Sequence, residues 1–311
     1  MTMTSTTLDS PTVPARIGGS VQTYQWHYQG QPYSIVYETR GQGEPLLLLP
    51  AFSTVSTRGE MSGLAEQLAS QFQVIALDWL GFGDSARPAI AYQPAVYHQL
   101  LQSFVRDVCK NSIAVIAAGH AAGYVMEAGA IDTPWSRIVL VAPTWRGPLP
   151  TMMGKQQPWF ATIRQTIGIP LLGQALYKLN TLPSFLSFMY RQHVYTNAAI
   201  LTPTFIEQKY QITQQPGARF APAAFVTGGL DPVAKREDFL KPFQSLTVPL
   251  LVLIGEQSPP SSKAEMESIA SLASIQSQHL PGSLGLHEEY ASEVAALVLP
   301  FLQSVAKADA T

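Results

Sequence analysis

An apolar segment runs directly into a glycine-rich turn near the middle of the chain, and this feature constrains the fold most. Residues 113–118 are Ile, Val and Ala only, and they are followed by Gly119-His120-Ala121-Ala122-Gly123. A short, continuous apolar run is typical of a strand that is buried on both faces. Glycines at these two positions allow a tight turn and close packing of the next helix. The sequence therefore predicts a buried strand that turns sharply into a helix.

The segments around this turn alternate between the two kinds of element. Strands are expected at 23–28, 33–39, 46–50, 74–77, 112–118, 138–141, 248–254 and 276–280, and helices at 58–70, 97–109, 121–130, 262–272 and 288–306. Such alternation predicts an α/β fold with a mostly parallel, twisted sheet between helices. It stops after Pro143, where the chain becomes rich in Pro, Gln, Thr and aromatic residues, with helical pieces at 157–167, 170–179 and 182–191.

This pattern predicts one core with an insertion. Residues 1–20 are expected to form a flexible tail, 21–143 and 230–306 the α/β core, and 144–229 a helical cap inserted in the core. The tail has no apolar stretch of the kind found in secretory signals, and no run of 18 apolar residues predicts a membrane span, so we expect a cytoplasmic protein.

Composition excludes several classes of function. The formal net charge is −2, from 19 basic and 21 acidic residues, which argues against nucleic-acid binding. The single cysteine, Cys109, excludes an internal disulfide and is expected to be a small buried side chain. The histidines lack metal-ligand spacing and no nucleotide-binding glycine motif is present, so neither a metal nor a cofactor is expected.

Two motifs together resemble the α/β-hydrolase superfamily. The turn at 119–123 is similar to the Gly-x-nucleophile-x-Gly elbow, and Asp78-x-x-Gly81-x-Gly83-x-Ser85 is similar to the loop after the strand that precedes the elbow strand. The resemblance implies an α/β-hydrolase fold over roughly residues 23–305. Segments 53–61, 142–150 and 222–232 further resemble a group of poorly characterised proteins of cyanobacteria and plant plastids.

The resemblance also implies where a catalytic triad would stand. Its nucleophile position is Ala121, which cannot attack a substrate, and its acid position is Ser258, which cannot orient an imidazole by charge. Glu256 and Asp231 are substitute acids; the alternatives are a surface residue at a strand end for Glu256 and a turn or helix cap for Asp231. His287 lies in the loop of the catalytic base, two or three residues late; the alternative is a histidine at a helix start that faces solvent.

An oxyanion hole would use the backbone amides of Phe52 and Ala122. His120 precedes the nucleophile position, and it is either a structural side chain under the sheet edge or, with Trp145 and Trp159, part of a substrate site. Ala121 is either an engineered substitution or a natural one. The family also has a His-Gly pair at the end of an early strand, where this chain has Pro50-Ala51. Since this pair, the nucleophile, the acid and the spacing of the histidine all differ from the family pattern, natural divergence is favoured.

Two functions follow from these residues. The first is a divergent or inactivated serine hydrolase that acts on an apolar, ester-like or lipid-like small molecule. The alternative is a non-catalytic pseudo-hydrolase that binds an apolar ligand or a partner protein in the former active-site cleft. The fold alone does not choose between them, and the sequence leaves the oligomeric state open.

The cap has an unusual charge balance. Residues 133–206 contain no acidic residue, six basic ones, and many Met, Leu and aromatic side chains. This composition fits an ordinary cap whose apolar face covers a pocket. It also fits a surface that touches an anionic membrane, or an entrance for a long apolar ligand with a negative head.

Overall fold

One eight-stranded sheet organises the protein. The structure, a computed structural model, describes residues 16–110, 112–131 and 134–304. The strands are β1 (Ser20–Tyr28), β2 (Gln31–Arg40), β3 (Glu44–Leu49), β4 (Phe72–Leu77), β5 (Ile113–Ala118), β6 (Trp135–Val141), β7 (Leu250–Gly255) and β8 (Gln276–Leu280). Their order is β1-β2-β4-β3-β5-β6-β7-β8. β1 and β2 run antiparallel to their neighbours, whereas the pairs from β4 to β8 are parallel.

Side-chain pattern explains which strands are central. The four leucines that end β3 are fully buried, and β5, β6 and β7 are nearly as apolar, as expected of parallel strands covered on both faces. β8 reads Gln-Ser-Gln-His-Leu and buries only its last residue, which suits an edge strand. The α/β-hydrolase fold predicted from the sequence is therefore confirmed.

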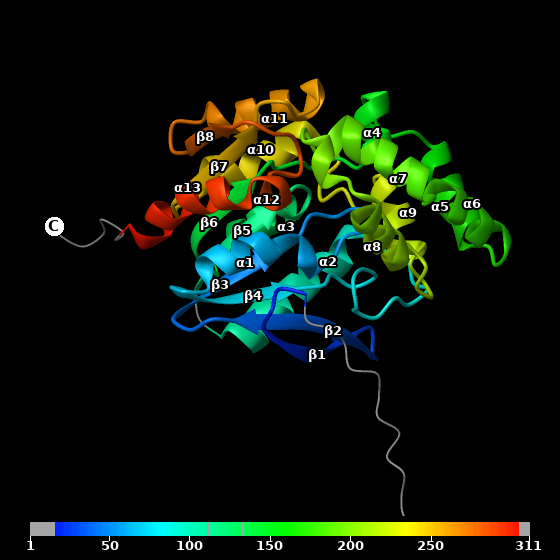
Figure 1. Ribbon diagram of the computed structural model, residues 1–311, viewed down its shortest axis with the longest axis horizontal. Helices are drawn as coiled ribbons and strands as arrows, with labels where there is room; N and C mark the ends of the chain where they lie inside the picture. Colours follow the sequence, from blue (N-terminus) through cyan, green and yellow to red (C-terminus); the bar gives the residue numbers. More distant parts are fainter. Residues whose placement is uncertain (1–15, 111, 132–133, 305–311) are drawn as a thin grey trace, which may run out of the picture.

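Two layers of helices cover the sheet (Figure 1). The core helices are α1 (Ser62–Leu68), α2 (Pro94–Phe104), α3 (Ala121–Ile131), α10 (Arg236–Ser245), α11 (Pro260–Ala270), α12 (Leu286–Glu289) and α13 (Ala291–Gln303). α1 packs on α12 and α13, whereas α3 packs on α2 and α10. The helix expected at 97–109 is α2, continued by a π-helical turn over Val105–Cys109, and Cys109 is buried as predicted.

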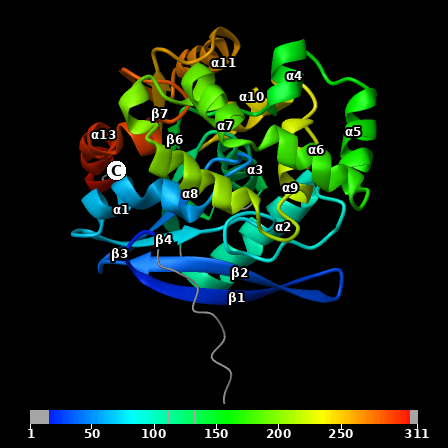
Figure 2. The ribbon, with the colours of Figure 1, turned by 45° about the vertical axis from the view of Figure 1, so that its right-hand side comes forward.

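The chain between β6 and α10 is mainly helical. It corresponds to the segment for which the sequence predicts a cap, and we call it the cap below. Its helices are α4 (Pro148–Met153), α5 (Trp159–Gly168), α6 (Leu172–Asn180), α7 (Pro183–Met189), α8 (Pro203–Thr213) and α9 (Phe220–Val226). Figures 1 and 2 both place α4, α5 and α6 at one edge of the molecule, away from α13. The sequence pattern missed α4, α8, α9 and α10, whose segments are short or interrupted by polar residues and proline.

The last residues of the tail expected at 1–20 pack against the core. Ile17 is buried, and the Gly19 N–H donates to Glu38 Oε1 at 2.6 Å. The Arg16 guanidinium pairs with Asp84 at 2.8 Å. Residues 16–20 therefore lie against the core, while 1–15 are outside the described residues.

Candidate functional site

The strand-to-helix corner is present, but its strained residue is Gly119. β5 ends at Ala118, Gly119 adopts a φ of +51°, and α3 begins at Ala121. In α/β-hydrolases the attacking side chain sits on the strained turn itself. Ala121 instead lies in the first helical turn and is fully buried. The residue at the corner is therefore Gly119, which has no side chain. It lies two positions before Ala121, the nucleophile position that the motif indicated.

The corner has little room for a larger residue. A Cβ built on Gly119 would lie 3.1 Å from the Ala51 Cβ, which is tight for two carbon atoms. The Ala122 N–H, expected in the oxyanion hole, donates to Gly119 O at 3.2 Å and closes the turn. The proposed role of Ala122 as an anion donor is therefore not supported by its geometry, whereas the role of the Phe52 amide stays a prediction.

Aromatic side chains fill the space beside the corner. The Phe52 ring stacks on Trp79, with 4.9 Å between centroids, and also contacts His120 and Phe225. The Tyr124 hydroxyl donates to Leu230 O at 2.6 Å, and His120 Nε2 lies 2.8 Å from the same oxygen. His120 is buried, and burial lowers its pKa to about 4, so the ring is neutral at pH 7 and Nε2 carries the proton. This arrangement favours the structural interpretation of His120.

Asp231 joins the cap to this cluster rather than serving His287. Its Oδ1 accepts from the Gly147 N–H at 2.7 Å and lies 3.8 Å from His120 Nε2, and its Oδ2 accepts from Gln156 at 3.3 Å. Burial raises its pKa to about 7, although these donors act in the opposite direction. The structure therefore places Asp231 beside His120 and bonds it to Gly147 at the start of α4.

His287 lies in a second buried group of charges. Its Nε2 is 3.6 Å from Glu60 Oε2, too far for a hydrogen bond, and neither ring nitrogen has a hydrogen-bond partner among the described residues. Lys209 Nζ, from α8, lies 3.0 Å from Glu288 and 3.8 Å from Glu60. Burial raises the pKa of Glu60, despite Lys209 and His287 nearby. His287 thus has a carboxylate neighbour, and that neighbour is Glu60.

The two positions after β7 are not joined to His287 by any described hydrogen bond. Ser258 is buried beside the Gly282–Ser283 backbone, and its Oγ lacks a partner among the described residues. Glu256 is exposed, in keeping with a surface residue at a strand end. Neither side chain takes the place of the missing catalytic acid.

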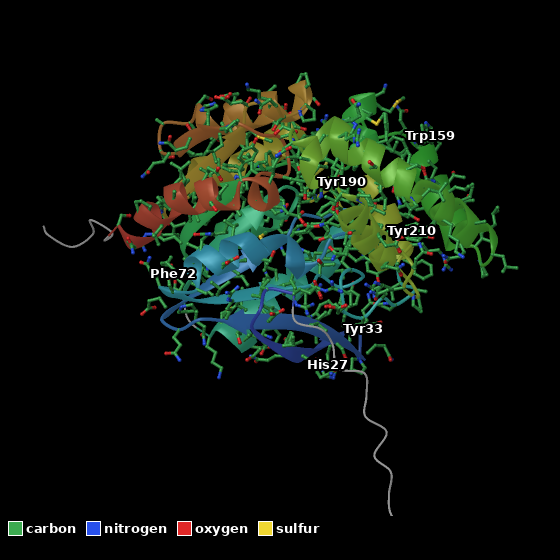
Figure 3. All side chains as sticks on the ribbon, in the orientation of Figure 1. His27, Tyr33, Phe72, Trp159, Tyr190 and Tyr210 are labelled. Carbon is green, nitrogen blue, oxygen red and sulfur yellow. The ribbon has the colours of Figure 1, made fainter. Side chains whose placement is uncertain are left out.

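The two tryptophans proposed as ligand contacts have different surroundings. Trp145 is buried and stacks on Phe239, with the Arg146 guanidinium 4.2 Å from its ring centroid. Trp159 is 47% exposed and lies at the outer edge of the cap (Figure 3). It lines an apolar groove of about 280 Å³ between α5 and α6, with Ile163 and Leu176. Trp159 therefore remains a candidate for ligand contact, whereas Trp145 is packed into the core.

A second cavity, of about 100 Å³, lies between α4 and α11 and is lined by Trp145, Arg146 and Glu265. Gly119, Ala121 and His287 line neither of these two cavities. Thr144, whose N–H donates to Gly119 O at 3.1 Å, also lines the second cavity, so that cavity adjoins the corner, whereas no residue of the corner lines the groove at Trp159.

The Asp78-x-x-Gly-x-Gly-x-Ser loop surrounds a buried arginine that sequence reasoning missed. Arg58 is fully buried; its Nε lies 3.0 Å from Glu38 and its Nη1 2.8 Å from Asp84, and Nη1 also pairs with Asp78. Burial opposes ionisation of Glu38, but backbone N–H groups and Arg58 outweigh it and lower the Glu38 pKa. Charged residues at the start of a helix usually face solvent, so no sequence pattern indicated this cluster.

Comparison with known proteins establishes the family. The model of the alpha/beta hydrolase family matches residues 46–297, which is most of the chain. The chain belongs to the alpha/beta hydrolase family. The resemblance inferred from the two motifs is therefore confirmed at this level, while the narrower similarity to cyanobacterial and plastid proteins stays a prediction. No curated protein matches the sequence significantly.

Solved structures agree with the fold of this alpha/beta hydrolase family member. A bromoperoxidase from Bacillus anthracis superposes with a TM-score of 0.70 at 15% identity, covering 92% of this chain and 100% of that one. A probable hydrolytic enzyme from Pseudomonas aeruginosa gives 0.71 at 17%, covering 92% and 95%. A putative alpha/beta hydrolase from Nostoc gives 0.68 at 22%, covering 92% and 99%. At these identities the similarity establishes the fold alone.

Two further observations concern metal ligands and membrane-spanning helices. Among residues 16–110, 112–131 and 134–304, no group of three or more His, Cys, Asp or Glu side chains is placed to hold a metal ion. Within the same ranges, no helix combines the length and hydrophobicity needed to cross a bilayer.

Proposed function

We propose that this alpha/beta hydrolase family member is non-catalytic and acts by binding an apolar ligand or partner through its cap. One observation carries the proposal: the strained corner that holds the nucleophile in this family is Gly119, which has no side chain to form an acyl adduct. Ala121 is helical and buried, so it offers no second choice.

The neighbouring groups support the same proposal. The Ala122 amide is used within the turn, and Phe52, His120 and Phe225 occupy the space beside it. A ligand site in the former cleft is therefore less favoured than the groove at Trp159, whose lining is mostly apolar. Pockets of this kind hold apolar molecules by burying their surface, and a few polar groups fix the orientation.

A second candidate function is non-covalent chemistry on an apolar, ester-like or lipid-like molecule. The observation that favours it is the buried pair of His287 and Glu60, whose nitrogen and oxygen lie 3.6 Å apart, with both ring nitrogens unpaired among the described residues. A buried histidine beside a carboxylate is the usual composition of a general base. This candidate requires a substrate to reach a side chain that is almost fully buried.

The two candidates separate in a hydrolysis assay. The purified protein is incubated with a fluorophosphonate probe and with p-nitrophenyl esters of short and long acids. We expect no labelling and no hydrolysis above that of a His287→Ala variant. The matched control is His279→Ala, since His279 is a partly exposed histidine of β8 that pairs with Glu267. Turnover that is lost in His287→Ala and kept in His279→Ala would overturn the proposal and support the second candidate.

Binding is measured separately through Trp159. The other four tryptophans are at most 2% exposed, so a collisional quencher that is too large to enter the core reports on the cap. We expect a brominated fatty acid, below its micelle concentration, to quench the wild type saturably and a Trp159→Phe variant much less. Absence of saturable quenching in the wild type would contradict binding at this groove.

A further inference from the structure

Exposed apolar side chains are confined to one part of the surface. Every large apolar side chain that the structure describes as exposed lies between residues 152 and 188, on α4 to α7 and their connections. We call this set of exposed side chains the cap rim. Isolated exposed apolar residues are normal on a protein surface, but a concentration of them indicates an interaction site. In Figures 1 and 2 the rim helices α4, α5 and α6 lie at the edge of the molecule.

The connection between α5 and α6 holds a leucine outward at an energetic cost. Leu171 has φ +63° and ψ −61°, and the Leu172 N–H donates to Pro170 O at 2.8 Å. These values describe the rare, strained form of γ-turn, which a leucine rarely adopts. The Leu171 side chain is 87% exposed, so the strain is not repaid by burial within the protein.

The same connection is a built structure rather than a slack loop. The Gly173 N–H donates to Ile169 O and the Ala175 N–H to Leu171 O, both at 2.9 Å. A Cβ on Gly173 would lie 2.0 Å from Ile167 O, so only glycine allows α6 to approach α5 this closely. A strained and exposed residue held by well-formed hydrogen bonds is a reason to suspect a function.

The charged side chains of residues 133–206 have a single sign. No Asp or Glu occurs from residue 133 to 206, and the first acidic residue beyond is Glu207 on α8. Lys155, Lys178 and Arg191 are exposed on the segments that carry or adjoin the rim. An anionic surface complements this arrangement, because each exposed cation gains attraction and no carboxylate opposes it.

We propose that the cap rim docks on an anionic lipid bilayer, with the Leu171 turn inserted among the acyl chains and the lysines facing the headgroups. The inference rests on one part of the proposed function, namely that the cap binds a partner, and it names that partner. It does not depend on whether the core is catalytic. Amphipathic surfaces that lie in the interface plane combine apolar side chains that enter the bilayer with basic ones that face anionic lipids.

The test is binding of the full-length protein to vesicles. Sedimentation is compared between phosphatidylcholine vesicles and vesicles that also contain phosphatidylserine, at low and high salt. Trp159 supplies an independent signal, because brominated acyl chains quench it only where the rim enters the bilayer. We expect binding to the anionic vesicles, weakening with salt, and quenching of Trp159.

Two variants and a control test whether Leu171 and Lys178 contribute to vesicle binding. Leu171→Gly removes the inserting side chain and relieves the strained turn, so partitioning should fall about tenfold while the melting temperature does not fall. Lys178→Gln should weaken partitioning to anionic vesicles about fivefold. Lys241→Gln, an exposed lysine of α10 outside the cap, should change partitioning little.

Several outcomes would overturn the inference. These are absence of vesicle binding, equal binding to neutral vesicles, or unchanged binding of Leu171→Gly. The inference is also overturned if the wild type forms a dimer that dissociates in Leu171→Gly and does not bind vesicles. The cap rim would then bind a second copy of the chain. If the brominated fatty acid binds and vesicles do not, the proposed function survives and the membrane inference fails.

Discussion

Replacing Asp231 with Asn should stabilise the protein at pH 8 and leave its stability unchanged near pH 4. The Asp231 side chain is only 6% exposed, and burial raises its pKa from 3.8 to about 7. Between these two pH values the folded state keeps a proton that the unfolded state has lost. The free energy of unfolding therefore falls as the pH rises, by about 1.4 kcal/mol per pH unit. Over about three units the loss reaches at most about 4 kcal/mol.

Asn removes this loss, since it does not ionise and its Oδ1 can still accept from the Gly147 N–H. His120 acts in the opposite direction. Its pKa is lowered to about 4, so its contribution is lost as the pH falls from about 6.5 to 4. The two effects oppose each other in the wild type between pH 4 and 6.5. In Asp231→Asn only the His120 effect remains, and stability should rise with pH over this range and then stay level.

Urea denaturation of both proteins at unit steps from pH 4 to pH 8 measures the difference. We expect it to grow from near zero at pH 4 to a few kcal/mol at pH 8. A difference that does not change with pH, or a variant less stable than the wild type at pH 8, would refute the assignment of Asp231 as a buried carboxyl with a raised pKa.

Three further predictions concern stability and reactivity. Gly119→Ala should cost about 1–2 kcal/mol in urea denaturation, because alanine is strained at φ +51° and approaches Ala51; no loss would place the strained turn elsewhere. Arg58→Met should cost about 3–5 kcal/mol, since it leaves the buried Glu38 and Asp78 carboxylates without their cation and Asp84 with Arg16 alone; a loss below 1 kcal/mol would contradict that cluster. Burial raises the pKa of the Cys109 thiol to about 12, so at pH 8 Ellman's reagent should react only after unfolding, and rapid reaction of the folded protein would show that the thiol is accessible.

The central strands of the core were predictable because strands that are buried on both faces consist almost entirely of apolar residues. β5 is a pure apolar run followed by glycine, and the strand expected at 276–280 coincides with β8. Helix ends were less predictable: the helix expected at 288–306 is divided at Tyr290 into α12 and α13. The short cap helices lack a sustained period, so tertiary packing rather than local pattern decides them.

The candidate site was predictable only in part. Sequence spacing placed the turn at 119–123 and His287 in the loop after β8, because these follow from chain order. It did not show that Gly119 rather than Ala121 takes the strained conformation, since either residue fits the same motif. Nor did it show that Glu60 would face His287, because these residues are far apart in sequence and meet only through packing.

The cluster around Arg58 also has a consequence for assembly. Glu38 comes from β2, Asp78 follows β4, and Asp84 lies in the next turn. The Arg58 guanidinium therefore binds all three carboxylates only when these three segments are correctly placed. A slip of one residue between β2 and β4 would turn the Glu38 side chain to the opposite face of the sheet. These ion pairs therefore destabilise a shifted pairing of β2 with β4 that burial of apolar side chains alone would tolerate. They select a single register for the antiparallel edge of the sheet.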